Sequence, residues 1–227
     1  MATTRLPNGL TTVVKTSSLG SYILPSPRTV HAFFTDFDTY NAAEWTLVQA
    51  GSGSQTLLDR DGGWVRFRNA SVEGNHTSLQ GVAESFAFES QKEMWFETKM
   101  EISNDDTQAV WFTGLYLTNA DPINVDPTDG VFFRNKDETK VIEFVSVNDS
   151  AETAVDVGSF NADEEFTLGY YYDGNGAFVI FKDKIPITRL TGVDVTTDTL
   201  AISLFIENGT GLAMDLNVDY FSVSKGR

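Results

Sequence analysis

Oxygen-bearing side chains gather in one stretch of the chain, between residues 119 and 129. The stretch contains five amide or carboxylate residues: Asn119, Asp121, Asn124, Asp126 and Asp129. Calcium prefers oxygen ligands of this kind and takes about six to eight of them. The stretch is therefore a candidate for a structural calcium site. Its spacing matches no fixed calcium motif, and polar residues beside proline are common in plain loops, which favours a loop without an ion.

The residue types and their spacing give little support for catalysis. The two histidines, His31 and His76, do not lie near a Gly-x-Ser-x-Gly sequence, which the chain lacks. There are no cysteines, which excludes disulfides and cysteine-ligated zinc. No glycine-rich loop leads into a helical pattern, as a phosphate-binding loop would. We therefore predict a protein that is not an enzyme and has no cofactor, with a structural calcium ion at residues 119–129 as the alternative.

The charge balance excludes two classes of partner. The formal net charge is −16. Binding to nucleic acid needs a basic patch or stripe, and an acidic protein is repelled by anionic membranes. No segment approaches the run of about 20 apolar residues that spans a membrane. We expect neither nucleic acid nor a membrane as a partner.

Residues 1–29 differ from the rest of the chain, because they contain three basic residues and no acid. The segment is thus +3, which leaves 13 basic and 32 acidic residues, or −19, for the remainder. It is too short and polar to fold alone. We predict an extended arm (1–29) that orders against a partner, followed by one domain (30–227); a floppy terminus is the alternative. The residues expected to make the contacts are Arg5, Leu6, Val13, Val14, Lys15, Tyr22, Ile23, Leu24 and Arg28.

The remainder of the chain reads as a series of about twelve to fourteen short strands separated by turn signals. Met94 to Ile102 alternates apolar residues with mostly charged ones, including Glu97 and Glu101, which predicts a strand with one solvated face. Val110 to Leu117 is apolar on both faces, as in a central strand. Glu84 to Glu89 is also expected to be a strand.

The stretch Glu164 to Lys184 carries the clearest structural signal. Aromatic and β-branched runs flank Asp173-Gly-Asn-Gly176, which predicts a tight hairpin, and a second turn follows at Lys182-Asp-Lys184. This hairpin resembles the back-sheet hairpin of the concanavalin A-like lectins and glucanases. The strand pair over residues 95–117 and the closing stretch 217–224 resemble the same superfamily. The resemblance implies an all-β jelly-roll sandwich of two antiparallel sheets.

Because this superfamily includes glycoside hydrolases, their acidic residues must be sought directly. Laminarinase-like enzymes place Glu-x-Asp-x-x-Glu on one strand, and no glutamate here has an aspartate two positions later. Glu143 is the nearest substitute, but its neighbours are apolar. Glu97 and Glu101 share a face with Lys99, which favours an ordinary solvated surface. In a lectin-like alternative, Trp111 or Tyr116 would stack on a sugar, although large aromatics in an apolar strand usually belong to the core.

A narrower resemblance concerns tailed-phage virion proteins with this sandwich, and it rests on the stretches 34–47 and 129–134. It implies a head decoration (cement) protein on the capsid surface, made in the host cytoplasm. The major capsid protein would then be the partner of the arm, and a homo-oligomer, either a dimer or a trimer, is expected. The alternatives are a carbohydrate-binding module and, third, a β-glucan hydrolase.

Overall fold

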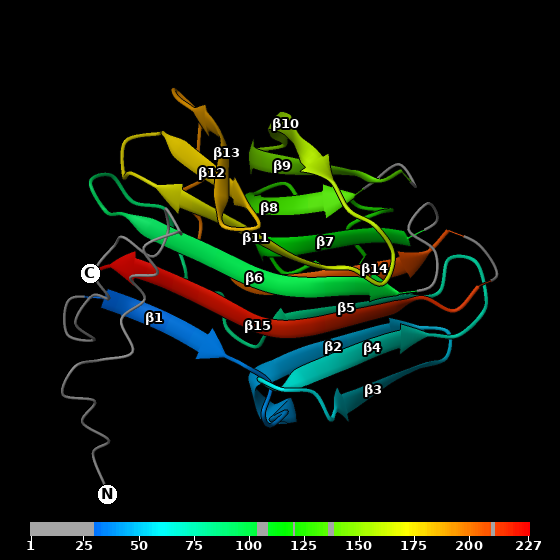
Figure 1. Ribbon diagram of the computed structural model, residues 1–227. Coiled ribbons are helices and arrows are strands. Elements are labelled where there is room, and N and C mark those ends of the chain that lie inside the picture. The colour runs from blue at the N-terminus through cyan, green and yellow to red at the C-terminus, as the bar shows by residue number, and fades with distance from the viewer. Residues whose placement is uncertain (1–29, 104–108, 120, 136–138, 210–211) are drawn as a thin grey trace, which may run out of the picture.

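The computed structural model describes residues 30–103, 109–119, 121–135, 139–209 and 212–227. These residues form fifteen strands in two antiparallel sheets and one short 3-10 turn, Ala42–Glu44 (Figure 1). The all-β jelly-roll sandwich expected from the sequence is therefore confirmed. The predicted arm and its contact residues lie outside the described residues.

The first sheet has eight strands. Its order is β13, β12, β11, β6, β15, β4 and β3, and β1 also pairs with β15. The long strand β15 makes this arrangement possible, because residues 215–218 pair with β4 and residues 221–226 pair with β1. The strands are β1 (Val30–Thr35), β3 (Gly53–Leu58), β4 (Trp64–Asn69), β6 (Met94–Ser103), β11 (Glu165–Tyr172), β12 (Phe178–Lys182), β13 (Ile185–Leu190) and β15 (Asp215–Gly226).

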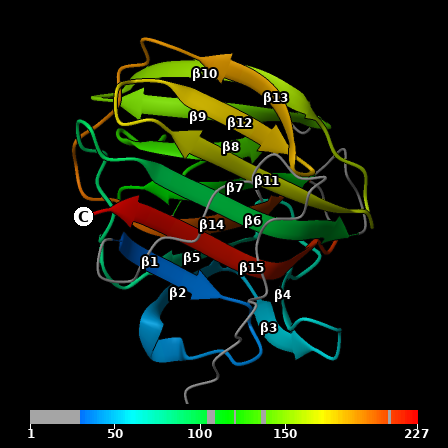
Figure 2. The same cartoon turned by 60° about the vertical axis from the view of Figure 1, so that its left-hand side comes forward.

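The second sheet has seven strands and lies behind the first in Figure 1; Figure 2 shows the same two layers from another side. Its order is β10, β9, β8, β7, β14, β5 and β2. The strands are β2 (Trp45–Ala50), β5 (His76–Gly81), β7 (Ala109–Tyr116), β8 (Gly130–Asn135), β9 (Val141–Asn148), β10 (Ala151–Ser159) and β14 (Ala201–Asn208).

The predicted hairpin forms β11 and β12, and its local chemistry explains the turn. The Asp173 carboxylate accepts hydrogen bonds from the backbone N–H of Asn175 (2.8 Å) and of Ala177 (3.1 Å). Gly174 and Gly176 have positive φ angles of 79° and 80°, which glycine adopts at no steric cost. The turn is therefore fixed by the residues that the sequence places there.

The main core lies between the two sheets and is built by period-two alternation. Met94, Phe96, Met100 and Ile102 of β6 point into it and are fully buried. Trp111 of β7 meets them from the second sheet. Each fully buried apolar side chain of this size stabilises the fold by about 1.5–3 kcal/mol.

A second apolar cluster lies on the outer face of the seven-stranded sheet. Here β7 presents its other set of residues, so that all eight of its positions are buried, as predicted for a central strand. Ile123, from the loop between β7 and β8, packs against the cluster. Its buried members are Val110, Phe112, Tyr116, Phe132, Val145, Val147 and Phe205, which we call the outer apolar cluster.

One expectation about strands is wrong, and two strands of the structure were not predicted. Residues 84–89 form no strand; Phe86 makes a single bridge to Leu200 and, like Phe88, fills the core. The unpredicted strands are β5, whose residues are mostly polar, and β10, whose residues are mostly polar or small. Both exist through pairing with a neighbour, which their own residue patterns do not reveal.

The expectation of a solvated charged face on β6 is wrong for Glu101, which is 6% exposed. Its carboxylate pairs with Arg60 (2.7 Å) and accepts hydrogen bonds from Asn217 (2.7 Å) and Ser103 (3.0 Å). Burial disfavours the charge, but these donors prevail and lower the pKa of Glu101. Asn217 lies opposite Glu101 in the register, so the partner comes from β15.

Gly114 provides a test of how closely β7 and β8 pack. A Cβ atom there would lie 2.5 Å from Cα of Phe132 and 2.7 Å from the carbonyl oxygen of Val131. Because backbone atoms cannot move aside cheaply, Gly114→Ala should lower the free energy of unfolding by about 2–3 kcal/mol. Chemical denaturation measures this loss.

The control is Gly81→Ala in the same sheet, where the nearest atom is 3.7 Å away. It should cost less than about 1 kcal/mol. Equal losses in the two variants would contradict the close approach of β7 and β8.

Candidate functional site

The acidic residue considered for hydrolysis, Glu143, is held by a buried arginine. Arg134 lies 2.9 Å from Glu143 and 2.6 Å from Glu152, and its side chain is 6% exposed. Burial disfavours the guanidinium charge, but the hydrogen bonds of Glu152 and Glu143 outweigh it and raise the pKa of Arg134. The arrangement therefore gives both carboxylates a structural task, which is to compensate a buried cation.

Three of the five predicted calcium residues hydrogen-bond to one another in the structure. The Asn119 side chain accepts a hydrogen bond from the Asp121 N–H (3.0 Å), and Asn124 donates to the Asp121 carboxylate (2.8 Å). Asp129 is buried and accepts from the N–H of Asp149 (3.2 Å), whereas Asp126 is exposed. Most of these groups thus form the loop's internal hydrogen bonds.

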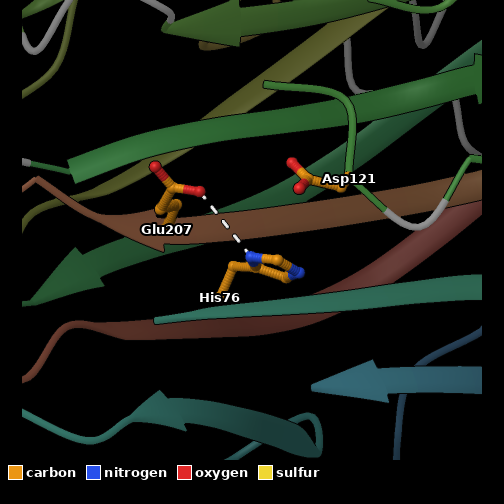
Figure 3. A group of neighbouring side chains, drawn as sticks. All are labelled: His76, Asp121 and Glu207. Carbon is orange, nitrogen blue, oxygen red and sulfur yellow. Dashed lines mark ion pairs between the residues drawn. The ribbon is translucent and has the colours of Figure 1, made fainter. Parts of the chain in front are cut away.

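Asp121 instead approaches two residues of the seven-stranded sheet. Figure 3 shows its carboxylate facing His76 of β5 and Glu207 of β14. Among the described residues, these three form the one group of histidine and acidic side chains with metal-ligand spacing. The sequence pointed to Asp121 but not to His76 or Glu207, because only strand pairing brings those two together.

The aromatic residues considered as sugar platforms are both inaccessible. Trp111 lies in the main core and Tyr116 in the outer apolar cluster, and each has an exposed fraction of 0%. Neither can stack on a sugar, so the interpretation of these residues as core is confirmed.

An open pocket lies on the first sheet, beside the C-terminal end of β15. Figure 1 marks this end of the chain with the letter C. Its volume is about 420 Å³. Half-buried Trp95, the second residue of β6, forms part of its wall. Polar and charged side chains complete the lining: Gln91, Lys92, Glu93, Asp173, Asn175, Ser224, Lys225 and Arg227. We call this the Trp95 pocket.

The strand register explains how the aromatic wall forms. Trp95 lies opposite Tyr171 of β11, and the two ring centroids are 4.3 Å apart. The Tyr171 hydroxyl donates a hydrogen bond to Glu93 (2.8 Å). Both rings occupy positions that face away from the main core, where the neighbouring residues of β6 are charged.

The rim of the pocket is built by the β11–β12 turn and by the end of β15. The Gln91 N–H donates to the carbonyl of Gly174 (2.7 Å), which ties the segment before β6 to the turn. The Gly226 N–H donates to the carbonyl of Glu93 (2.9 Å). Asp173 and Asn175 are therefore held beside Trp95 by backbone contacts.

A cluster of opposite charges lies beside the pocket. Glu89 accepts hydrogen bonds from Lys225 and Lys92, and these lower the pKa of Glu89 to about 2. A second hollow of about 460 Å³, lined in part by His31 and Glu89, shares Lys92, Lys225 and Arg227 with the Trp95 pocket. The two hollows therefore adjoin.

Sequence reasoning did not identify the Trp95 pocket. The signal was present, because Trp95 sits in the outward-facing set of an alternating strand, together with Glu97 and Lys99. A large aromatic at a solvent-facing position is a stronger indication of binding than one in an apolar run. The turn residues of the rim gave no such signal.

Comparison with known proteins identifies similar structures but no sequence relatives. No family model matches the chain, and no curated protein matches its sequence.

No helix among the described residues is long and apolar enough to cross a membrane.

Three solved structures illustrate the likeness. An endo-1,3-beta-glucanase from Streptomyces sioyaensis has a TM-score of 0.63 and 12% identity, with 90% of this chain and 99% of that chain covered. The Emp47p carbohydrate recognition domain has a TM-score of 0.62, 11% identity, and coverage of 89% and 100%. A beta-glucanase from Bacillus licheniformis has a TM-score of 0.59, 15% identity, and coverage of 85% and 97%. At these identities the likeness shows the fold, which is the concanavalin A-like jelly-roll sandwich.

Proposed function

We propose that this protein is a carbohydrate-binding module that holds a neutral glycan in the Trp95 pocket. The observation that carries the proposal is the accessible aromatic ring of Trp95 beside planar polar side chains, in a hollow of about 420 Å³. Pockets for small ligands start at about 300 Å³. The hollow therefore suits one or two sugar rings.

The chemistry of the lining matches that of a sugar. One face of a pyranose ring presents C–H groups, which pack on an indole ring, and its edge presents hydroxyls that both donate and accept. Asn175 and Gln91 offer amides that can do the same, and Asp173 offers acceptors. The site thus combines an apolar wall with a few polar groups that fix orientation.

The charge distribution favours a neutral ligand. The chain has a net charge of −16, which repels polyanionic glycans at long range. The lining carries Lys92, Lys225 and Arg227 against Glu93 and Asp173. Because Glu89 beside the pocket pairs with Lys92 and Lys225, neither sign dominates. A neutral hexose-based oligosaccharide meets no electrostatic penalty there.

The structural neighbours support this class of function, because they include a carbohydrate recognition domain and two glucanases. Binding without hydrolysis is part of the proposal. It is supported by the contacts of Glu143, whose carboxylate is occupied by Arg134.

Replacement of Trp95 tests the proposal. A glycan array should first identify a neutral oligosaccharide bound by the full chain, and calorimetry then gives its Kd. Trp95→Ala should raise that Kd about tenfold or more, because the stacking surface is lost. Asn175→Ala should raise it by a smaller factor, since one hydrogen-bonding group is removed.

Phe34→Ala is the matched control, because Phe34 is 64% exposed on β1 and does not line the pocket. It should leave the Kd unchanged, and thermal melting should show all variants folded. The proposal fails if no neutral glycan binds, or if Trp95→Ala and Phe34→Ala behave alike.

A second proposal concerns the virion. The observation that favours it is the contrast between the +3 charge of residues 1–29 and the −19 charge of the remainder. In this proposal the protein decorates a phage capsid as a dimer or trimer, and the basic arm binds acidic grooves between major capsid protein subunits. The sandwich would bridge neighbouring subunits without catalysing a reaction.

Removal of residues 1–29 tests the second proposal. The shortened chain should keep its fold by circular dichroism but should no longer sediment with assembled capsids. A second test keeps the arm but removes its charges, in the triple variant Arg5→Gln, Lys15→Gln and Arg28→Gln. This variant should weaken capsid binding in a salt-dependent way. Capsid binding that survives the deletion would contradict the role of the arm, whereas glycan binding should be unaffected.

A further inference from the structure

Three ligand-bearing side chains converge at one end of the outer face of the seven-stranded sheet. His76 and Glu207 lie directly opposite each other on β5 and β14. Asp121 reaches them from the loop between β7 and β8 (Figure 3). The ligand atoms of the three residues all lie within 4.8 Å of one another, and each residue is partly buried. Three separate segments of the chain thus deliver one ligand each.

The distance between His76 and Glu207 suits a shared ion better than a direct contact. Nδ1 of His76 lies 3.7 Å from Oε2 of Glu207. This is longer than an N–H···O hydrogen bond, which spans about 2.7–3.2 Å. Two ligands at about 2.1 Å from a tetrahedral zinc ion are about 3.4 Å apart. A small contraction would therefore bring both atoms into the coordination sphere of one ion.

Two of the three ligands, Asp121 and His76, are positioned by further contacts. The Asp121 carboxylate accepts from the backbone N–H of Asn124 (3.2 Å) and from its side-chain amide (2.8 Å). Each carboxylate oxygen has a second lone pair for a metal. The His76 ring packs on Phe205, with ring centroids 5.3 Å apart. A hydrogen-bonded carboxylate such as that of Asp121, and an apolar surround, are typical of metal sites.

The ligand types discriminate between ions. Calcium and magnesium take oxygen ligands, whereas imidazole suits zinc and other transition metals. Three protein ligands of the His, Asp and Glu type leave a fourth tetrahedral position open. We propose that His76, Asp121 and Glu207 bind a divalent transition-metal ion, with Zn²⁺ as the best match, at a position open to a water molecule or an oxygen ligand.

Direct metal titration tests this site. The full chain, freed of metal with a chelator, is titrated with Zn²⁺ and separately with Ca²⁺ by calorimetry. Wild-type protein should bind one Zn²⁺ per chain with a Kd at least tenfold lower than that for Ca²⁺. Zn²⁺ should also raise the melting temperature, because it binds only the folded arrangement.

Three variants define the ligands: His76→Ala, Glu207→Gln and Asp121→Asn. Each should raise the Kd for Zn²⁺ at least tenfold; Glu207→Gln and Asp121→Asn keep the side-chain volume and so guard against misfolding. His31→Ala is the matched control, because it removes the other histidine, which stacks on Phe86 elsewhere. The His31→Ala variant should bind Zn²⁺ with the same Kd as the wild-type protein.

Cobalt substitution supplies an independent readout. Co²⁺ at this site should give a visible absorption spectrum of a four-coordinate ion, and His76→Ala should abolish it. The proposal is overturned if the wild-type protein shows no Zn²⁺ binding at free Zn²⁺ concentrations up to about 100 μM. It is equally overturned if Zn²⁺ binding survives the three variants, or if Ca²⁺ binds in preference. Those results would leave His76 and Glu207 as a simple ion pair.

Discussion

The packing of apolar side chains on both faces of the seven-stranded sheet is the constraint on which the rest of the structure depends. Strand β7 buries one set of residues between the sheets and the other set in the outer apolar cluster. Phe112, Phe132 and Phe205 meet there at ring-centroid distances of 5.5–6.0 Å. Ile123 packs on the cluster from the β7–β8 loop. A face filled in this way cannot also be an open polar trench.

This filling leaves the polar chemistry at the margins of the sandwich. At one end of the outer face, Asp121 meets His76 and Glu207. Elsewhere on that face, Arg134 is compensated by Glu143 and Glu152, because a buried guanidinium needs paired carboxylates. The accessible aromatic wall belongs instead to the opposite sheet, at Trp95. The proposed glycan site and the proposed metal site thus lie on different sheets. One proposal can therefore be wrong while the other is right.

Local patterns predicted much of the fold, whereas the sites depend on long-range pairing. The alternation over residues 94–102 and the Asp-Gly-Asn-Gly turn act within a few residues, and β6, β11 and β12 form as expected. Strand β5 has a polar sequence and exists because β14 and β2 pair with it. The same pairing sets His76 against Glu207, and no local pattern records it. Trp95 was visible as an aromatic among charges, but its pocket also needs the end of β15.

The location of the ligand is the central claim, and amide chemical-shift mapping tests it most directly. The full chain, labelled with ¹⁵N, is titrated with the neutral oligosaccharide that it binds best. The account predicts saturable shifts at the Trp95 indole N–H, Asn175 and Gly226, which surround the Trp95 pocket. Shifts confined to β7, β14 and the β7–β8 loop, with none around Trp95, would contradict it.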